Sequence, residues 1–284
     1  MIIDIHTHIF PDRIAPAAIE KLRAASHVRA FTDGTQAQLL TSMAVAGIDL
    51  SIALPAATNP RQVPHLNDAA LRIHAARAET GIDSFGGMHP AFEGWEEELE
   101  RLRGAGIRGI KLHPPYQEID FDDGRYIRIL KKAAALGLLV LTHAGLDVGL
   151  PGAEQATPDK IRRAIDLAPE GTLILAHMGG WRCWEAVERL LPGYPVCLDT
   201  AFSLGPLTPS GDGFYRTEKE MEMLSEAGFL QLVRAFGARR ILLGTDSPWA
   251  DQRETLEKIR ALPLTEEEKD WILGGTAAGL LGLT

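Results

Sequence analysis

The sequence predicts an α/β protein that folds as one (βα)8 TIM barrel spanning residues 1–284. Short apolar segments alternate with longer segments of mixed apolar and charged spacing, which predicts strands joined by helical crossovers. The strand-like segments are apolar at nearly every position, as expected when both faces of a parallel sheet are covered. No linker-like stretch divides the chain, and its length accommodates the roughly 250 residues that such a barrel needs.

Eight segments are predicted as the barrel strands. They read IIDIH (2–6), IDLSIALP (48–55), IDSFGGM (82–88), GIRGIKLH (106–113), GLLVLTH (137–143), GTLILAH (171–177), YPVCLDT (194–200) and RILLGTD (240–246). An open doubly wound sheet could use the same strands. The barrel is preferred because no Gly-rich phosphate-binding turn follows an early strand.

Helices are predicted between these strands, for example over 63–80, 94–106 and 123–137, with one additional helix near 14–25. Pro158 directly after Thr157 predicts a helix that begins there, because proline is favoured at the first helical position. Thr265 and Glu268 have the spacing of a capping box, which predicts another helix start.

Composition limits the partners. The net charge of −9 without a Lys/Arg block argues against nucleic acid and anionic membranes, and no apolar run is long enough to span a bilayer. The N-terminus does not read as a signal peptide. Cys183 and Cys197 are expected to be free thiols, although one disulfide between them is compatible with the sequence. We therefore expect a cytoplasmic enzyme acting on a small molecule, and a homodimer is compatible with this class of barrel.

The stretch DIHTH (4–8) ends the first predicted strand with two histidines two residues apart. Side chains alternate faces along a strand, so His6 and His8 are expected on one face with Asp4 below them. Two neighbouring imidazoles on one face form half of a metal site. The other ligands must come from elsewhere in the chain.

Histidines recur where the other strands end. Six of the nine lie at or directly after predicted strand ends, and Asp246 ends the last strand; the histidines are His6, His8, His89, His113, His143 and His177. The carboxyl ends of barrel strands meet at one rim, where barrel enzymes place their functional groups. Histidine and aspartate bind divalent ions that lower the pKa of bound water. Asp246 is also placed to accept a proton from such a water.

The ordered motifs resemble the amidohydrolase superfamily, in particular its amidohydrolase-related TIM-barrel group (amidohydrolase 2). The matching stretches are DIHTH, GIKLHP (109–114), LTHAG (141–145), LAHMGGW (175–181) and LGTDSPW (243–249). The resemblance implies that His6, His8, His143 and Asp246 hold a divalent metal. It implies that His177 is either a ligand of a second metal or a catalytic histidine beside the first.

One ion is favoured over two in this interpretation, and zinc over manganese, iron or cobalt, since His and Asp ligands suit all four. Lys111 and His113 share a strand face and are candidates for a second metal or for substrate, as is His89. Lys111 is compatible with a carbamate, a substrate contact, or a salt bridge to Asp4 or Asp199.

Residues after the strands are expected to contact the substrate. Trp181 and Arg182 follow the sixth strand, and Arg182 would suit a substrate carboxylate. Further candidates lie in the long loop after the seventh strand: Phe202, Phe214, Tyr215 and Arg216. Each of these arginines is equally compatible with a solvated surface position.

The favoured function is hydrolysis, in which a metal-bound water attacks an amide, imide, lactone or ester carbonyl. Asp246 would carry the proton, and His177 or the metal would stabilise the oxyanion. The alternative is a metal-dependent non-oxidative decarboxylase of an aromatic or unsaturated carboxylic acid, which the resemblance also includes. A TatD-type nuclease fits less well because no glutamate ends a middle strand and the surface is acidic. A non-catalytic metal-binding scaffold fits less well because every expected ligand position is retained.

Overall fold

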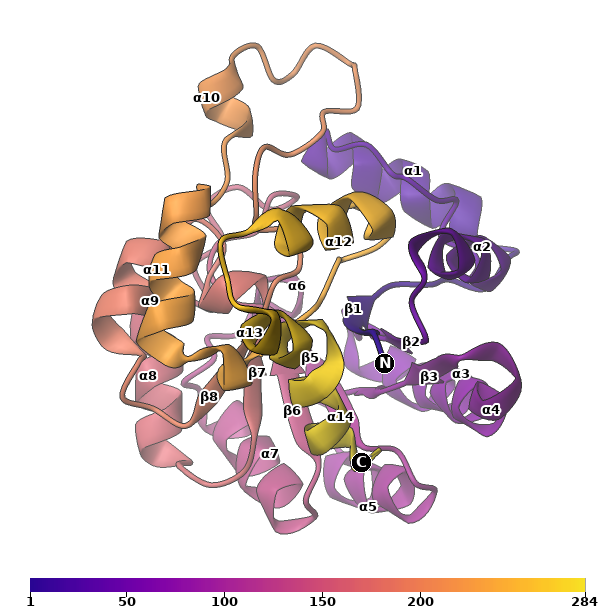
Figure 1. Ribbon diagram of the computed structural model, residues 1–284. Coiled ribbons are helices and arrows are strands. Elements are labelled where there is room, and N and C mark those ends of the chain that lie inside the picture. The colour runs from indigo at the N-terminus through magenta and orange to yellow at the C-terminus, as the bar shows by residue number, and fades with distance from the viewer. Residues whose placement is uncertain (284) are drawn as a thin grey trace.

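The computed structural model describes residues 1–283, and its strands form a parallel barrel surrounded by helices (Figure 1). The strands are β1 (Ile3–Thr7), β2 (Leu50–Ala53), β3 (Ile82–Ser84), β4 (Gly86–Gly87), β5 (Gly109–Leu112), β6 (Leu139–Thr142), β7 (Leu173–Leu175), β8 (Val196–Asp199) and β9 (Ile241–Leu242). β1 to β3 pair in order, and so do β4 to β9, always in parallel.

Two connections complete the barrel. β3 and β4 are parts of one strand interrupted at Phe85, whose backbone N–H still donates to Ala53 O. At the other junction Ile5 N donates to Leu243 O at 2.9 Å, and Thr7 pairs in parallel with Ser247. The predicted fold and all eight predicted strand positions are therefore confirmed.

Helices follow the strands and cover the outside of the barrel. Their bounds are α1 (Ala15–Ser26), α2 (Gln36–Ala46), α3 (Val63–Ala75), α4 (Arg77–Thr80), α5 (Trp95–Gly104), α6 (Pro114–Gln117), α7 (Gly124–Ala135), α8 (Pro158–Leu167), α9 (Trp184–Leu190), α10 (Glu218–Met221), α11 (Glu226–Phe236), α12 (Gln252–Ala261), α13 (Glu266–Asp270) and α14 (Thr276–Leu281). Short tight or widened turns are η1 (Pro60–Gln62), η2 (His177–Gly179), η3 (Ala238–Arg240) and η4 (Trp271–Gly275).

The predicted helix starts are confirmed, but one predicted helix, over 63–80, is divided into two. The helix expected near 14–25 is α1, and the Thr265–Glu268 capping box starts α13. The segment 63–80 divides at Ala76 into α3 and α4, because Ala76 leaves the helical conformation. Both cysteines are free thiols.

Apolar side chains form two layers around the strands. One cluster fills the barrel interior and includes Ile5, Leu141 and Ile174, with Ala277 and Leu281 of α14 packed against it. A larger cluster joins the outer strand faces to the surrounding helices. Burial on both faces explains why the strands are apolar throughout.

The first strand contains an irregularity that changes one predicted position. The β1–β2 register shifts between Asp4 and Thr7, so the alternation of faces breaks there. Asp4 therefore does not lie below His6 and His8, and that expectation was wrong. Its carboxylate instead accepts hydrogen bonds from Thr245 Oγ1 and from Gln252 Nε2 of the surrounding helix α12.

The segment around α10 projects from one end of the molecule beside α1 (Figure 1). Val28 and Pro209 form an antiparallel bridge, and Tyr215 donates its hydroxyl to Ser26 O at 2.9 Å. Phe214 stacks on His27 at 3.8 Å between ring centroids. Phe214 and Tyr215 therefore hold this segment against the end of α1.

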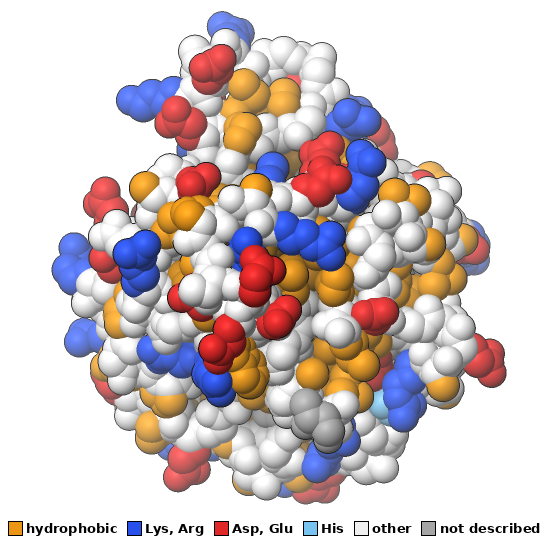
Figure 2. All heavy atoms as spheres, viewed as in Figure 1, with side chains coloured by type: hydrophobic (Ala, Val, Ile, Leu, Met, Phe, Trp, Pro, Cys, Tyr) orange, Lys and Arg blue, Asp and Glu red, His pale blue; other side chains and the backbone are white. Residues whose placement is uncertain are grey.

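The surface is mixed in charge. On the face drawn in Figure 2, acidic and basic side chains are interspersed and no continuous basic patch is visible. Within residues 1–283, no helix combines the length and apolarity needed to cross a bilayer.

Candidate metal centre

The strand-end residues surround one large cavity of about 1050 Å³. The titratable side chains at the carboxyl ends of the strands line one part of this cavity. They come from β1, β5, the turns after β6 and β7, and the loop after β9: His6, His8, Lys111, His113, His143, Asp147, His177 and Asp246. Their side chains meet because the carboxyl ends of parallel barrel strands point to the same rim.

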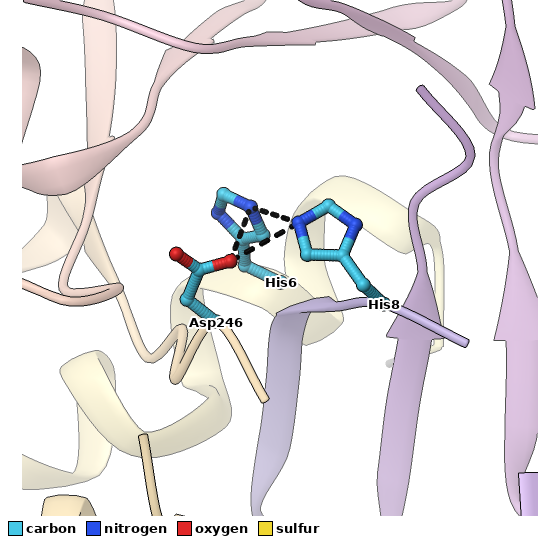
Figure 3. A group of neighbouring side chains, drawn as sticks. All are labelled: His6, His8 and Asp246. Atoms are coloured by element: carbon cyan, nitrogen blue, oxygen red, sulfur yellow. Dashed lines mark hydrogen bonds and ion pairs between the residues drawn. The ribbon is translucent and has the colours of Figure 1, made fainter. Parts of the chain in front are cut away.

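His6, His8 and Asp246 converge on one point (Figure 3). The two Nε2 atoms are 3.2 Å apart, and Asp246 Oδ1 lies 3.1 Å from His8 Nε2 and 3.5 Å from His6 Nε2. His6 Nδ1 donates to Asp199 Oδ2 at 2.8 Å, and His8 Nδ1 donates to Leu54 O at 2.8 Å. Each ring therefore presents its Nε2 lone pair to the other ring and to Asp246.

His143 and His177 follow the adjacent strands β6 and β7, and their rings also meet nitrogen to nitrogen. His143 Nε2 donates to Leu146 O and His177 Nδ1 donates to Ala201 O, both at 2.9 Å. The remaining nitrogens, His143 Nδ1 and His177 Nε2, are 3.2 Å apart. Burial lowers the pKa of both histidines to about 3, so both rings are neutral at pH 7.

These two pairs belong to one arc of imidazoles. Neighbouring ring centroids are 5.1 Å apart for His8–His6, 5.5 Å for His6–His177, 4.8 Å for His177–His143 and 4.4 Å for His143–His113. Lone pairs that face one another repel unless a proton or a cation lies between them. The donor set, with each tautomer fixed by an oxygen acceptor on the far side, fits a divalent ion.

His113 and His143 also lie within reach of a carboxylate that the sequence analysis missed. Asp147 Oδ2 is 3.6 Å from His113 Nε2 and 3.8 Å from His143 Nδ1, so the three form a second ligand-like group. His113 Nδ1 accepts from Tyr116 N, which places the His113 proton on Nε2, toward Asp147. Asp147 stands four residues after His143, and that spacing was the available signal.

Lys111 lies inside the site, 1% exposed, with its Nζ 3.1 Å from His6 Nε2. Within residues 1–283 no carboxylate oxygen is within 4.0 Å of this ammonium, so Lys111 makes no direct salt bridge to Asp4 or Asp199, although the charge of Asp199 lies near enough to favour the ammonium. Burial lowers the pKa of Lys111 to about 8 and raises that of the neighbouring Asp199 to about 7.

Two site residues adopt an unusual backbone conformation. His177 has φ 59° and Asp246 has φ 65°, in the left-handed region that non-glycine residues avoid. Each such residue costs on the order of 1 kcal/mol or more, and strain of this kind gathers at functional sites. The fold therefore holds both side chains in positions that relaxed backbone would not give.

Some of the remaining predicted site residues line the cavity, and others lie elsewhere. Trp181 lines the cavity, and its buried indole N–H has no hydrogen-bond partner among residues 1–283. His89 is buried outside the cavity wall, where its Nδ1 accepts from Ala91 N. Arg182 is exposed and donates to Glu220 O at 2.6 Å, so it anchors the segment around α10. Phe202 lines the cavity, whereas Phe214 does not.

A parallel barrel with a His- and Asp-lined rim defines the class of the protein, and sequence comparison gives its family. The family described as Amidohydrolase (Amidohydro_2) matches residues 3–283. The chain belongs to this family. No curated protein matches the chain significantly in sequence.

Solved structures with the same fold cover nearly the whole chain. An uncharacterized TIM-barrel protein of Bordetella bronchiseptica is 20% identical with a TM-score of 0.72, over 99% of this chain and 98% of that one. The 5-carboxyvanillate decarboxylase of Sphingomonas paucimobilis is 17% identical with a TM-score of 0.66, over 100% and 99%. A dihydroxybenzoic acid decarboxylase of a Polaromonas species, solved with manganese and the inhibitor 2-nitroresorcinol, is 17% identical with a TM-score of 0.69, over 99% and 97%.

Proposed function

We propose that this chain is a metal-dependent, non-oxidative decarboxylase of an aromatic or unsaturated carboxylic acid. The observation that carries the proposal is the buried Lys111 ammonium, which makes no ion pair within 4.0 Å among residues 1–283 and lines a cavity shared with the candidate metal ligands. The charges of Asp199, Asp246 and Asp147 favour this ammonium from a greater distance. A substrate carboxylate would accept its N–H groups in a charge-assisted hydrogen bond, whereas a neutral amide or ester offers only a weaker acceptor. The similarity to aromatic acid decarboxylases supports the same substrate class.

His6, His8, His143 and Asp246 would hold one divalent ion, with His177 beside it or as a further ligand. A bound ion would supply a Lewis acid that attracts an anionic substrate and stabilises negative charge as it develops. Zinc is the favoured metal and manganese, iron and cobalt are alternatives, because this donor set does not discriminate among them.

The protein's own groups have separate roles in this proposal. Lys111 binds and orients the substrate carboxylate, since an ion on His6 Nε2 would free the lysine N–H groups that now point there. The unpaired Trp181 N–H donates to a second polar group of the substrate. The bond between the carboxyl carbon and its neighbour breaks, carbon dioxide leaves, and the electron pair stays on the neighbouring carbon. That carbon then takes a proton from a water molecule, and solvent neutralises the hydroxide that remains. His177 positions this water, because its ring is neutral and its one N–H is bound to Ala201 O.

Hydrolysis of an amide, imide, lactone or ester is the second candidate, and the description of the matched family favours it. In that case Asp246 accepts the proton of an attacking water, and a bound ion would supply the charge that stabilises the oxyanion, since the one N–H of neutral His177 is bound to Ala201 O. Lys111 would then bind an anionic group elsewhere on the substrate.

Product analysis separates the two reactions. Purified protein reconstituted with Zn²⁺ or Mn²⁺ is incubated with hydroxybenzoates and related unsaturated acids, and separately with lactones, imides and esters. We expect carbon dioxide from at least one acid, lost in both Lys111→Met and His177→Asn but retained in the exposed control Lys131→Met. Turnover of a lactone or ester with no carbon dioxide from any acid would assign hydrolysis instead.

A further inference from the structure

The cavity is much larger than the polar site at its base. Cavities of about 300 to 1,000 Å³ hold drug-sized ligands, so a volume of about 1050 Å³ exceeds what a single-ring acid would fill. From His8 the wall continues along Ile9 and Phe10 on one side and Leu54 and Pro55 on the other. The extra space therefore adjoins the metal centre directly.

One side of this extension is a face of α1. The cavity-lining residues Ile14, Ala18, Leu22 and Ser26 are spaced four apart, so they lie along a single face of the helix. Ile14 keeps 46% of its surface exposed although it is a large apolar side chain. The first three residues form an apolar stripe that does not belong to either main core cluster.

Another part of the wall is a face of α3. Leu66, Ala69, Ala70 and Ile73 line the cavity at helical spacing. Small residues at 69 and 70 leave room between the two helices, where larger side chains would have closed it. An apolar helix stripe normally packs against another element. Leu66 and Ile73 do so, against the larger core cluster, and also border the cavity, whereas the stripe of α1 borders the cavity alone.

We propose that the substrate carries an elongated apolar tail, which lies in the groove between α1 and α3 while its acid group binds at the metal centre. This inference rests on the proposed function only in placing the acid group of the substrate at the metal centre. The two helix faces favour carbon chains or extended ring systems because the side chains they present are mostly apolar, while polar residues such as Gln36, Thr58 and Asn59 line other parts of the same cavity. Arg61, His65 and Arg72 are exposed at the same wall and mark its solvent edge.

Calorimetric binding of benzoate, 4-butylbenzoate and 4-octylbenzoate to the metal-loaded protein tests the inference without requiring turnover. We expect affinity to rise by up to about fourfold for each added methylene that becomes buried. Ala69→Trp on α3 and Ala18→Trp on α1, which fill the groove from different helices, should abolish this rise and leave benzoate affinity within about twofold. Ala75→Trp on α3 and Ala24→Trp on α1 are matched controls, since both positions are exposed and outside the cavity wall.

Affinity that does not depend on chain length, or a rise unchanged in both groove variants, would overturn the proposal. A 4-alkylbenzoate with a terminal carboxylate that binds more tightly than 4-octylbenzoate would also overturn it, because Arg61 and Arg72 would then select a diacid. If the proposed function is wrong, the same binding measurements give a different result. Benzoate binding would then be independent of the metal, while the chain-length dependence and its loss in the groove variants would persist.

Discussion

The imidazoles of His143 and His177 face each other through two nitrogens 3.2 Å apart, while each ring donates its other N–H to a backbone carbonyl oxygen. Because a carbonyl oxygen only accepts, both facing nitrogens carry lone pairs when the rings are neutral. His6 and His8 show the same arrangement at 3.2 Å. A cation between or beside these nitrogens removes the repulsion.

The first prediction is metal content. Reconstituted protein is expected to retain about one divalent ion per chain by elemental analysis, and His143→Ala to lose it. Asp199→Asn weakens the partner of His6 Nδ1 and should lower metal affinity by about 10- to 100-fold. His65→Ala, an exposed histidine, is the control and should bind normally. Retention of two ions would instead give His177, His113 or a carbamylated Lys111 the role of ligand.

Lys111→Met is expected to weaken the binding of an acid substrate without lowering the stability of the fold. Loss of a charge-assisted hydrogen bond should weaken benzoate binding by about tenfold or more, measured by calorimetry. This buried ammonium makes no ion pair within 4.0 Å among residues 1–283, and its desolvation cost opposes the favourable charges of Asp199, Asp246 and Asp147, so the free energy of unfolding should change little in the variant. A drop of several kcal/mol in urea unfolding would show that Lys111 mainly supports the fold.

The helix α7 should contribute an acid-sensitive component of stability. Asp123 caps this helix and accepts hydrogen bonds from the side chain and backbone of Arg125, which lower its pKa from 3.8 to about 2. The folded pKa is depressed, so this contribution is present above about pH 3.8 and is lost as the pH falls toward 2. Asp123→Ala should cost about 1 kcal/mol at pH 7 in urea unfolding.

Asp123→Asn serves as the matched control, because asparagine caps equally well but does not titrate. The stability difference between wild type and Asp123→Asn should therefore shrink between pH 5 and pH 3. A difference that stays constant over that range would contradict the assigned pKa.

Arg182 is expected to act on the segment around α10 rather than on the metal. Its guanidinium donates to Glu220 O and Glu222 O and lies 4.8 Å from the centroid of the Trp181 ring. Arg182→Ala should speed tryptic cleavage at Arg216 and Lys219 several-fold while metal content stays unchanged. Arg189→Ala, an exposed arginine on α9, should leave cleavage at the wild-type rate. Loss of metal or of benzoate affinity in Arg182→Ala would point to a direct role in the site.

The sequence by itself determined the barrel and the rim on which its histidines lie. Strands buried on both faces must be apolar throughout, so their positions can be recognised in the sequence. The carboxyl ends of parallel strands meet at one rim in any such barrel. Residues placed by strand ends alone, such as His6, His8, His143 and His177, were therefore foreseeable as neighbours.

Only the tertiary structure decided which side chains face which. A register shift within β1 turned Asp4 toward Thr245 and Gln252, and the loop after β6 brought Asp147 beside His113. Arg182 was turned to the carbonyls of α10 by contacts across 38 residues of sequence. The proposed groove exists because the fold brings apolar residues of α1 and α3 to the wall of one cavity. Register shifts, loop conformations and helix placement depend on long-range contacts, and local residue patterns do not encode these.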